Sequence, residues 1–319
     1  MSLAELLKKY PNDEAAEEFF VQQRWPEGVA CPKCGNCDVQ DGANHPEMRF
    51  RCRGCWGYFS VRTGTTMERS KLGCLKWLMA AYLLMANRKG ISSIRLGEEL
   101  GVPQSTAWFL AHRIREGWHE ASVAFEGVVE VDETFIGGLE KNKHWSKKIR
   151  NRERTGERVL GEGKTVVVGI REQKSGRVHA KHLSKRENRN VGAFVRDNTC
   201  PDAILHTDEW MGYRTIPRLR YFISHAEKEF VRGAVTTNGI ESLWACLKRS
   251  YRGTYHLMSR RHLQRYVDEC CGRLNMRGLK LEDKLGRLIR GMDGKSLNYA
   301  ALTAPDAETF APRIIPMLW

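Results

Sequence analysis

The sequence predicts an α/β protein in which a domain built on a mixed sheet follows a small metal-stabilised module and a helical segment. Three observations predict this architecture. Two Cys-x-x-Cys pairs stand near the N-terminus, a strongly apolar stretch and two shorter helical segments follow, and the central part alternates short strands with helices. We expect the order β-β-β-α-β-β-α in that central part.

Length and charge narrow the class of protein. The chain has 319 residues, 41% of them apolar, and a net charge of +14, which favours a polyanionic partner such as double-stranded DNA. Its longest apolar run has ten residues, Trp77 to Ala86, whereas a membrane span needs about 20. We therefore expect a cytoplasmic, nucleoid-associated protein whose ten cysteines are thiols or metal ligands.

The first expected element after an N-terminal helix is a zinc ribbon. Its ligands would be Cys31, Cys34, Cys52 and Cys55, because each Cys-x-x-Cys pair directs two thiolates at one ion and two pairs complete a tetrahedral site. Such a site has no open position, so the zinc is structural. Cys37 also follows Cys34 closely, but the knuckle is already complete without it. Short strands are expected at 48–51 and 58–61.

A helix-turn-helix segment is expected next. Residues 75–87 form an apolar helix, Ser92 or Ser93 caps a second helix that ends at Leu100, and a third helix covers 104–116 after the turn Gly101-Val102-Pro103. In this motif the start of the last helix meets base edges. The expected DNA-binding residues are Gln104, Ser105 and Thr106, with Arg113 and Arg115 nearer the phosphates. An ordinary helical bundle is the alternative.

The central part supplies acids at the ends of its elements. Strands are expected at 127–134, 164–171, 178–183, 203–207 and 221–225, with helices at 187–197 and from 237 or 238 to about 251. Phosphoryl transfer on DNA uses two hard cations about 4 Å apart, and carboxylates from separate elements can hold them. We expect Asp132, Asp208 and Glu241 to bind two Mg²⁺ ions, with Mn²⁺ as the alternative metal.

Each acid has an ordinary alternative. Glu130 shares a strand face with Asp132, while Glu133 points to the other face. Asn238 lies one helical turn before Glu241 and is an alternative third ligand. An isolated surface acid is the usual explanation of any one carboxylate.

Basic residues follow the last expected helix and fill one loop. Lys248 lies two turns after Glu241 on the same face, where an ammonium can contact phosphate. Arg249 and Arg252 continue a strip that would track a DNA backbone. Residues 141–158 carry eight Lys or Arg against two Glu, and we expect this loop to hold flanking or target DNA, a solvated loop being the alternative.

With these motifs in place, the chain resembles bacterial insertion-sequence transposases of the DDE class, in the ISXO2-like group. The resemblance covers about residues 20–280. The matching stretches are CPKC…CRGC, FSVRTGTTMERSK, GISSIRLGEELGVPQSTAWFLAHRIRE, VDETFIGG, LHTDEWMGY, TNGIESLWACLKRSYRGTYHLMS and RHLQRYVDECCGRLNMR. It implies a ribonuclease-H-like catalytic domain in which Asp132 and Asp208 are the first two catalytic acids, Glu241 the third, and Lys248 the lysine that often follows.

The function implied is Mg²⁺-dependent cleavage and strand transfer at the terminal inverted repeats of the element, carried out by a homodimer or larger assembly on DNA. Two rivals remain: a non-catalytic DNA-binding regulator, and a ribonuclease-H-like nuclease that cuts without joining. The expected units are an N-terminal helix at 1–24, the ribbon at 25–68, the helix-turn-helix at 69–120, the catalytic domain at 125–278, and a tail of unknown role at 279–319.

Overall fold

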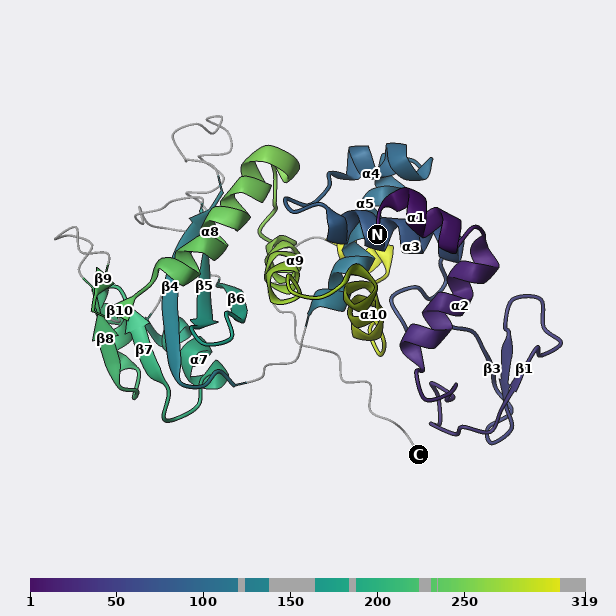
Figure 1. Cartoon of the computed structure of the whole chain (residues 1–319), viewed down its shortest axis with the longest axis horizontal. Coiled ribbons are helices and arrows are strands. Elements are labelled where there is room, and N and C mark those ends of the chain that lie inside the picture. Colours follow the sequence, from purple (N-terminus) through teal and green to yellow (C-terminus); the bar gives the residue numbers. More distant parts are fainter. Residues whose placement is uncertain (120–123, 138–163, 184–187, 224–230, 234, 305–319) are drawn as a thin grey trace.

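The computed structural model describes residues 1–119, 124–137, 164–183, 188–223, 231–233 and 235–304 (Figure 1). A five-stranded sheet with its helices lies on one side of the molecule, and a helical body that carries the ribbon lies on the other (Figure 1). Helix α9 (Leu263–Asn275) lies between them.

The N-terminal 24 residues form two helices where one was expected. These are α1 (Leu3–Lys9) and α2 (Asp13–Arg24). Pro11 separates them, and Asn12 begins the second helix by accepting the backbone N–H of Ala15 at 2.9 Å. The following ribbon is an antiparallel sheet of β1 (Val39–Asp41), β2 (Phe50–Cys52) and β3 (Tyr58–Phe59); the first of these strands was not expected.

Three helices follow the ribbon within two residues of the expected ranges. They are α3 (Cys74–Ala86), α4 (Ser93–Leu100) and α5 (Gln104–Arg115). Ser92 caps α4 by accepting the backbone N–H of Arg95, and Gly101 ends it with a left-handed φ of 61°. The chain runs from α5 directly into the short 3-10 helix η1 (Glu116–Trp118).

The core of this N-terminal body is completed by the end of the chain. Helix α10 (Leu281–Gly291) contributes Leu285 and Leu288, both fully buried, to the same cluster as α2 and α3. Its C-terminus approaches η1 so closely that a Cβ on Gly291 would lie 2.1 Å from the Gly117 carbonyl oxygen. Part of the expected tail is therefore structural, and it is followed by α11 (Tyr299–Thr303).

The central sheet is mixed, as expected. Its order is β6-β5-β4-β7-β8, in which β4, β5 and β6 are antiparallel and β7 and β8 run parallel to β4. The strands are β4 (Val128–Ile136), β5 (Thr165–Glu172), β6 (Val178–Leu183), β7 (Ile204–Thr207) and β8 (Arg220–Phe222). The small two-stranded sheet comprises β9 (Val231–Arg232) and β10 (Val235–Thr236), and the short helix η3 (Met211–Thr215) follows β7.

Helices cover both faces of this sheet and make two separate cores. Helix α7 (Asn188–Asn198) packs on one face through Val191 and Val195. Helix α8 (Asn238–Ser250) and α9 pack on the other face, joined by a π-helical segment, η5 (Tyr251–Tyr255). The second face is the one that carries α8, and therefore Glu241.

A buried ion cluster connects the two sides of the molecule. Glu269 of α9 is fully buried and accepts hydrogen bonds from Arg115 Nε of α5 at 2.6 Å and from the Tyr255 hydroxyl of η5 at 2.7 Å. It also pairs with Arg273. Burial alone would raise the pKa of the Glu269 carboxyl, but Arg273 and Arg115 outweigh it and hold that pKa below its ordinary value.

Replacing Glu269 by Gln is expected to lower the free energy of unfolding by about 3–5 kcal/mol, because two buried guanidinium groups lose their counter-charge. Urea unfolding followed by circular dichroism measures the change. Glu282→Gln is the matched control, since Glu282 pairs with Lys9 at 2.8 Å on the surface, where both side chains are about half exposed. Equal effects of the two substitutions would contradict the importance of the cluster.

The same cluster predicts a pH dependence. The folded-state pKa of Glu269 lies below the ordinary value of 4.5, so its stabilisation is present above that value and is lost as pH falls through the folded pKa. Wild-type stability is therefore expected to fall below about pH 4.5 more steeply than that of Glu269→Gln, as measured by thermal unfolding across pH. Parallel curves would refute this assignment.

Candidate functional site

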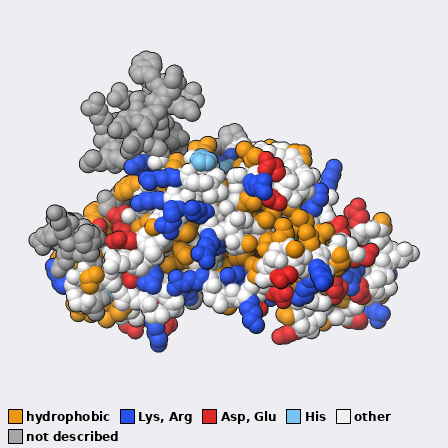
Figure 2. Space-filling view, turned by 45° about the horizontal axis from the view of Figure 1, so that its top comes forward, with side chains coloured by type: hydrophobic (Ala, Val, Ile, Leu, Met, Phe, Trp, Pro, Cys, Tyr) orange, Lys and Arg blue, Asp and Glu red, His pale blue; other side chains and the backbone are white. Residues whose placement is uncertain are grey.

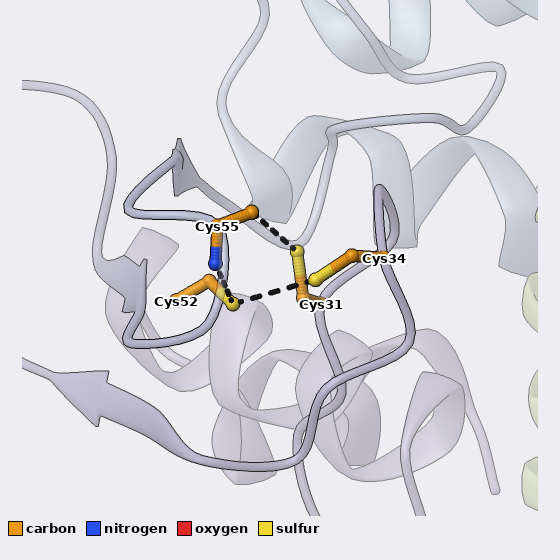
Figure 3. A group of neighbouring side chains, drawn as sticks. All are labelled: Cys31, Cys34, Cys52 and Cys55. Carbon is orange, nitrogen blue, oxygen red and sulfur yellow. Dashed lines mark hydrogen bonds between the residues drawn. The ribbon is translucent and has the colours of Figure 1, made fainter. Parts of the chain in front are cut away.

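The four expected zinc ligands meet at one point of the ribbon (Figure 3). The sulfur atoms of Cys31 and Cys55 are 3.7 Å apart, and those of Cys34 and Cys52 are 3.6 Å apart. Tetrahedral Zn²⁺ with Zn–S bonds of about 2.3 Å requires sulfur separations of about 3.8 Å. The donor set therefore fits structural zinc.

Backbone hydrogen bonding favours the thiolate form of Cys52, one of the four ligands. The Cys55 backbone N–H donates to the Cys52 sulfur at 3.4 Å, and this hydrogen bond is the main cause that lowers the pKa of the Cys52 thiol to about 7. Gly35 takes the left-handed φ of 74° that closes the first knuckle. Cys37 lies outside the cluster, with its sulfur 3.8 Å from the Gly35 carbonyl oxygen.

The ribbon also presents an aromatic face that the sequence reasoning missed. Trp56 is 63% exposed and Tyr58 is 42% exposed. The guanidinium carbon of Arg51 lies 5.2 Å from the centroid of each ring. Trp56 has a positive φ of 59°, a conformation that few non-glycine residues adopt. Exposed aromatic rings around an arginine are typical of binding surfaces.

The acids of β4 divide between its two faces as strand alternation predicts. Asp132 Oδ2 accepts the indole N–H of Trp244 in α8 at 2.9 Å. Glu130, on the same face, is buried and also contacts α8. Glu133 points to the other face, where it accepts the hydroxyl of Tyr213 in η3.

Asp208 follows the strand next to Asp132. Strand β7 runs parallel to β4, the pairing ends with Glu130 opposite His206, and Asp208 is the first residue after β7. The Asp208 carboxylate accepts the backbone N–H of Trp210 at 3.0 Å, which orients it at the strand end.

Glu241 lies in the first turn of α8, the helix that packs on the Asp132 face. It is partly buried, and its Oε1 accepts the Thr237 hydroxyl at 3.3 Å, whereas Asn238 is exposed. Among the described residues, only the four cysteines form a group of three or more potential ligands within 4.8 Å of one another. The three acids thus occupy adjoining elements without being drawn into a cluster as tight as the zinc site.

A hollow lies beyond Asp132, and its lining contains one acid, Glu133, and three basic residues. Its volume is about 330 Å³, and Lys248, Lys164 and Arg252 line it together with Phe135 and Tyr251. Lys248, Arg249 and Arg252 are exposed. Figure 2 shows a band of Lys and Arg side chains on the side of the molecule where α8 lies. The surface beside the acids therefore suits a phosphate backbone.

The start of α5 is accessible, but its two expected arginines are not. Arg115 is only 2% exposed and pairs with the buried Glu269. Gln104 and Ser105 are exposed and Thr106 is partly exposed, with Gln104 donating to the Ser93 hydroxyl of α4 at 2.7 Å. Arg113 is only 7% exposed and donates to the Glu68 carbonyl oxygen. Because its guanidinium is held inside the body in this way, Arg113 does not lie on the surface that DNA could reach.

Two further expectations concern the basic loop and membrane-spanning helices. The basic loop at 141–158 lies outside the described residues. Within the described residues, none of the helices has both the length and the apolar character that crossing a membrane requires.

Comparison with known proteins gives three findings. Residues 124–275 match the ISXO2-like transposase domain, and residues 11–56 match the transposase zinc-ribbon domain. A Halobacterium salinarum relative, named as an uncharacterized protein in transposable element ISH50, is 24% identical over 268 residues, which cover 82% of this chain and 90% of the relative. A chain in the cryo-EM structure of a simian T-cell lymphotropic virus intasome with PP2A regulatory subunit B56 gamma aligns over 76% of this chain and 78% of its own length, with 11% identity and a TM-score of 0.25.

Substitution of Cys34 by Ser is expected to remove the zinc ion from the purified chain, because three thiolates bind the metal far more weakly than four. Metal content measured by mass spectrometry under native conditions gives the readout. Cys37→Ser is the matched control, since Cys37 is equally exposed and lies three residues away. Loss of zinc from Cys37→Ser would refute the assignment of the four ligands.

Proposed function

This chain belongs to the ISXO2-like transposases, and from that premise we propose that it cuts and joins double-stranded DNA at the ends of its own insertion sequence. One observation carries the proposal. Asp132 lies on β4, Asp208 directly follows the neighbouring parallel strand β7, and the helix that bears Glu241 packs on the same face of β4 as Asp132, inside the segment that matches the transposase domain.

We propose that Asp132, Asp208 and Glu241 bind two Mg²⁺ ions, with Mn²⁺ able to replace them. Carboxylate oxygens are the ligands that these hard cations prefer, and the three acids come from adjoining elements. When bound, the ions supply electrostatic stabilisation of the attacking and leaving oxygens in an in-line displacement at phosphorus. Asn238 remains the alternative third residue because it lies one turn before Glu241.

The side chains around these acids have separate tasks in the proposed reaction. Trp244 orients the Asp132 carboxylate through its indole N–H. Lys248 contacts a phosphate of the bound strand, and Glu241 also helps to position the attacking oxygen. Water first attacks the phosphodiester at the element end, and the 3′-hydroxyl released by that cut then attacks target DNA. Neither displacement requires a covalent bond to the protein.

Recognition of the terminal inverted repeats falls to the N-terminal modules. Helices α4 and α5 would act as a helix-turn-helix, with Gln104, Ser105 and Thr106 at the base edges. The ribbon adds its aromatic face, and Arg249 and Arg252 follow the phosphate backbone. Because both ends of an element must be handled together, we propose a homodimer or a larger assembly on DNA.

Glu241→Gln is expected to lower the rate of strand cleavage by about a thousandfold, since the loss of a metal ligand removes several kcal/mol of transition-state stabilisation. The assay uses labelled DNA from the flanks of the protein's own gene, with Mg²⁺, and separates cleaved from joined products. Asn238→Ala is the matched control on the same helical turn and is expected to remain active. The opposite pattern would assign the third position to Asn238.

The same assay separates the rival functions. Nicked DNA without joined products from the wild-type chain would favour a nuclease. Specific binding without any cleavage would favour a regulator.

Replacing Lys248, Arg249 and Arg252 together by Ala is expected to weaken DNA binding at all sequences. The slope of log K against log salt concentration should fall by about 0.9 for each DNA phosphate that the variant no longer neutralises. Fluorescence anisotropy at several salt concentrations measures both effects. Arg287→Ala on the exposed side of α10 serves as control, and an unchanged slope in the triple variant would contradict the proposed DNA path.

A further inference from the structure

Glu130 is a buried acid to which the proposed reaction assigns no task. It is 1% exposed, yet both of its oxygens have defined partners. Oε1 accepts Arg171 Nη1 at 3.0 Å, and Oε2 accepts the backbone N–H of Ile240 at 2.7 Å. Arg171 is also its register partner on β5. Burying a carboxylate costs free energy because the charge loses its hydration, and this cost must be offset by an opposite charge and hydrogen bonds. Here Arg171 of β5 and the backbone of α8 provide them.

The contact with Ile240 supplies what the start of α8 needs. The first backbone N–H groups of a helix have no acceptor within the helix, and a negative charge is favourable there. In the described structure the side chain of the N-cap residue Thr237 accepts no backbone N–H of the first turn, and its hydroxyl donates instead to Glu241 Oε1. Glu130 therefore takes the place of a capping side chain, from a strand 110 residues away in sequence.

The sequence accommodates this contact with a glycine. A Cβ on Gly239 would lie 2.1 Å from Arg171 Nη1 and 2.5 Å from Glu130 Oε2. The backbone of α8 can therefore approach the Glu130–Arg171 pair closely because residue 239 has no side chain.

A second contact joins β4 and α8, at matching distances along the strand and the helix from the first contact. Asp132, two residues after Glu130, accepts the indole N–H of Trp244, four residues after Ile240. Two residues span about 6.7 Å along a strand, and four residues span about 6 Å along a helix. The two contacts can therefore form at the same time between β4 and α8 when the helix runs alongside the strand. Trp244 also covers Gly169, the register partner of Asp132, where a Cβ would lie 2.6 Å from the ring.

We infer that Glu130 is a positioning residue: it fixes the N-terminus of α8 on β4 and so holds Glu241 on the face of the sheet that carries Asp132. The inference rests on the proposed function, because it assigns Glu130 a task in the same reaction. Arg171 balances the charge of Glu130 and directs its carboxylate at the helix. Together with the Asp132–Trp244 bond, this contact fixes how far α8 is displaced along the strand and how it is rotated.

The test compares Glu130→Gln with Glu172→Gln in single-turnover cleavage with Mg²⁺. Glu172 is a matched control because its carboxylate accepts a backbone N–H, that of Glu126 at 3.1 Å, in the same sheet but away from α8. We expect Glu130→Gln to cleave about 100-fold more slowly, as a displacement of about 1 Å at a catalytic group does, with an unchanged Kd for DNA. Glu172→Gln should cleave at the wild-type rate.

A second variant reaches the same contact without altering any carboxylate. Gly239→Ala pushes the start of α8 away from Arg171 and Glu130, so it should reproduce the slow cleavage with unchanged DNA binding. In both variants, hydrogen exchange should accelerate at residues 238–241 and stay unchanged in α7.

Three outcomes decide the matter. Wild-type cleavage rates in Glu130→Gln would overturn the inference. So would a parallel loss of cleavage, DNA binding and thermal stability, which describes a merely structural residue. If neither wild type nor Glu172→Gln cuts DNA, the proposed function fails instead, and faster exchange at 238–241 in Glu130→Gln would still support the fixing of α8 by Glu130.

Discussion

The ionic cluster around Glu269 is the interaction on which the arrangement of the molecule depends. One buried carboxylate receives guanidinium groups from α5 and α9 and a hydroxyl from η5. The face of Tyr266, 4.3 Å from the Arg115 guanidinium, adds a further favourable contact for the excess positive charge. Since α5 begins at Gln104 and η5 directly follows α8, the cluster sets the proposed DNA-reading end in a fixed relation to the helix that carries Glu241.

The zinc-ligand cluster and the proposed catalytic site are built in opposite ways. The ribbon gathers its ligands within a span of 25 residues, through two knuckles whose geometry is local. The acids of the sheet come from three elements distant in sequence, and their placement depends on strand register and on the packing of α8. The first centre is therefore specified by spacing, whereas the second is specified by the whole fold of the central domain.

This difference explains how much the sequence could predict. The cysteine spacing identified all four ligands, and strand alternation separated Asp132 from Glu133, because both signals are local. Arg113 was placed near phosphate because its charge suits DNA, but its partners Glu68 and Trp77 lie on earlier segments that periodicity cannot bring together. The roles of α10 and Glu130 were missed for the same reason. The contact of Glu130 with Ile240 and that of Arg290 with Gln23 join residues more than 100 positions apart, for which a single sequence carries no local mark.

The return of α10 to the N-terminal core has a consequence for synthesis. The core that supports α3 and α5 includes Leu285, Leu288 and Met292, which leave the ribosome after the entire sheet domain. Domains generally fold in the order in which they are made, but this body is divided by the domain inserted into it. A nascent chain thus completes the packing of its first helices last, and it finishes the proposed DNA-reading surface only when the sheet domain that carries Asp132, Asp208 and Glu241 has already been made.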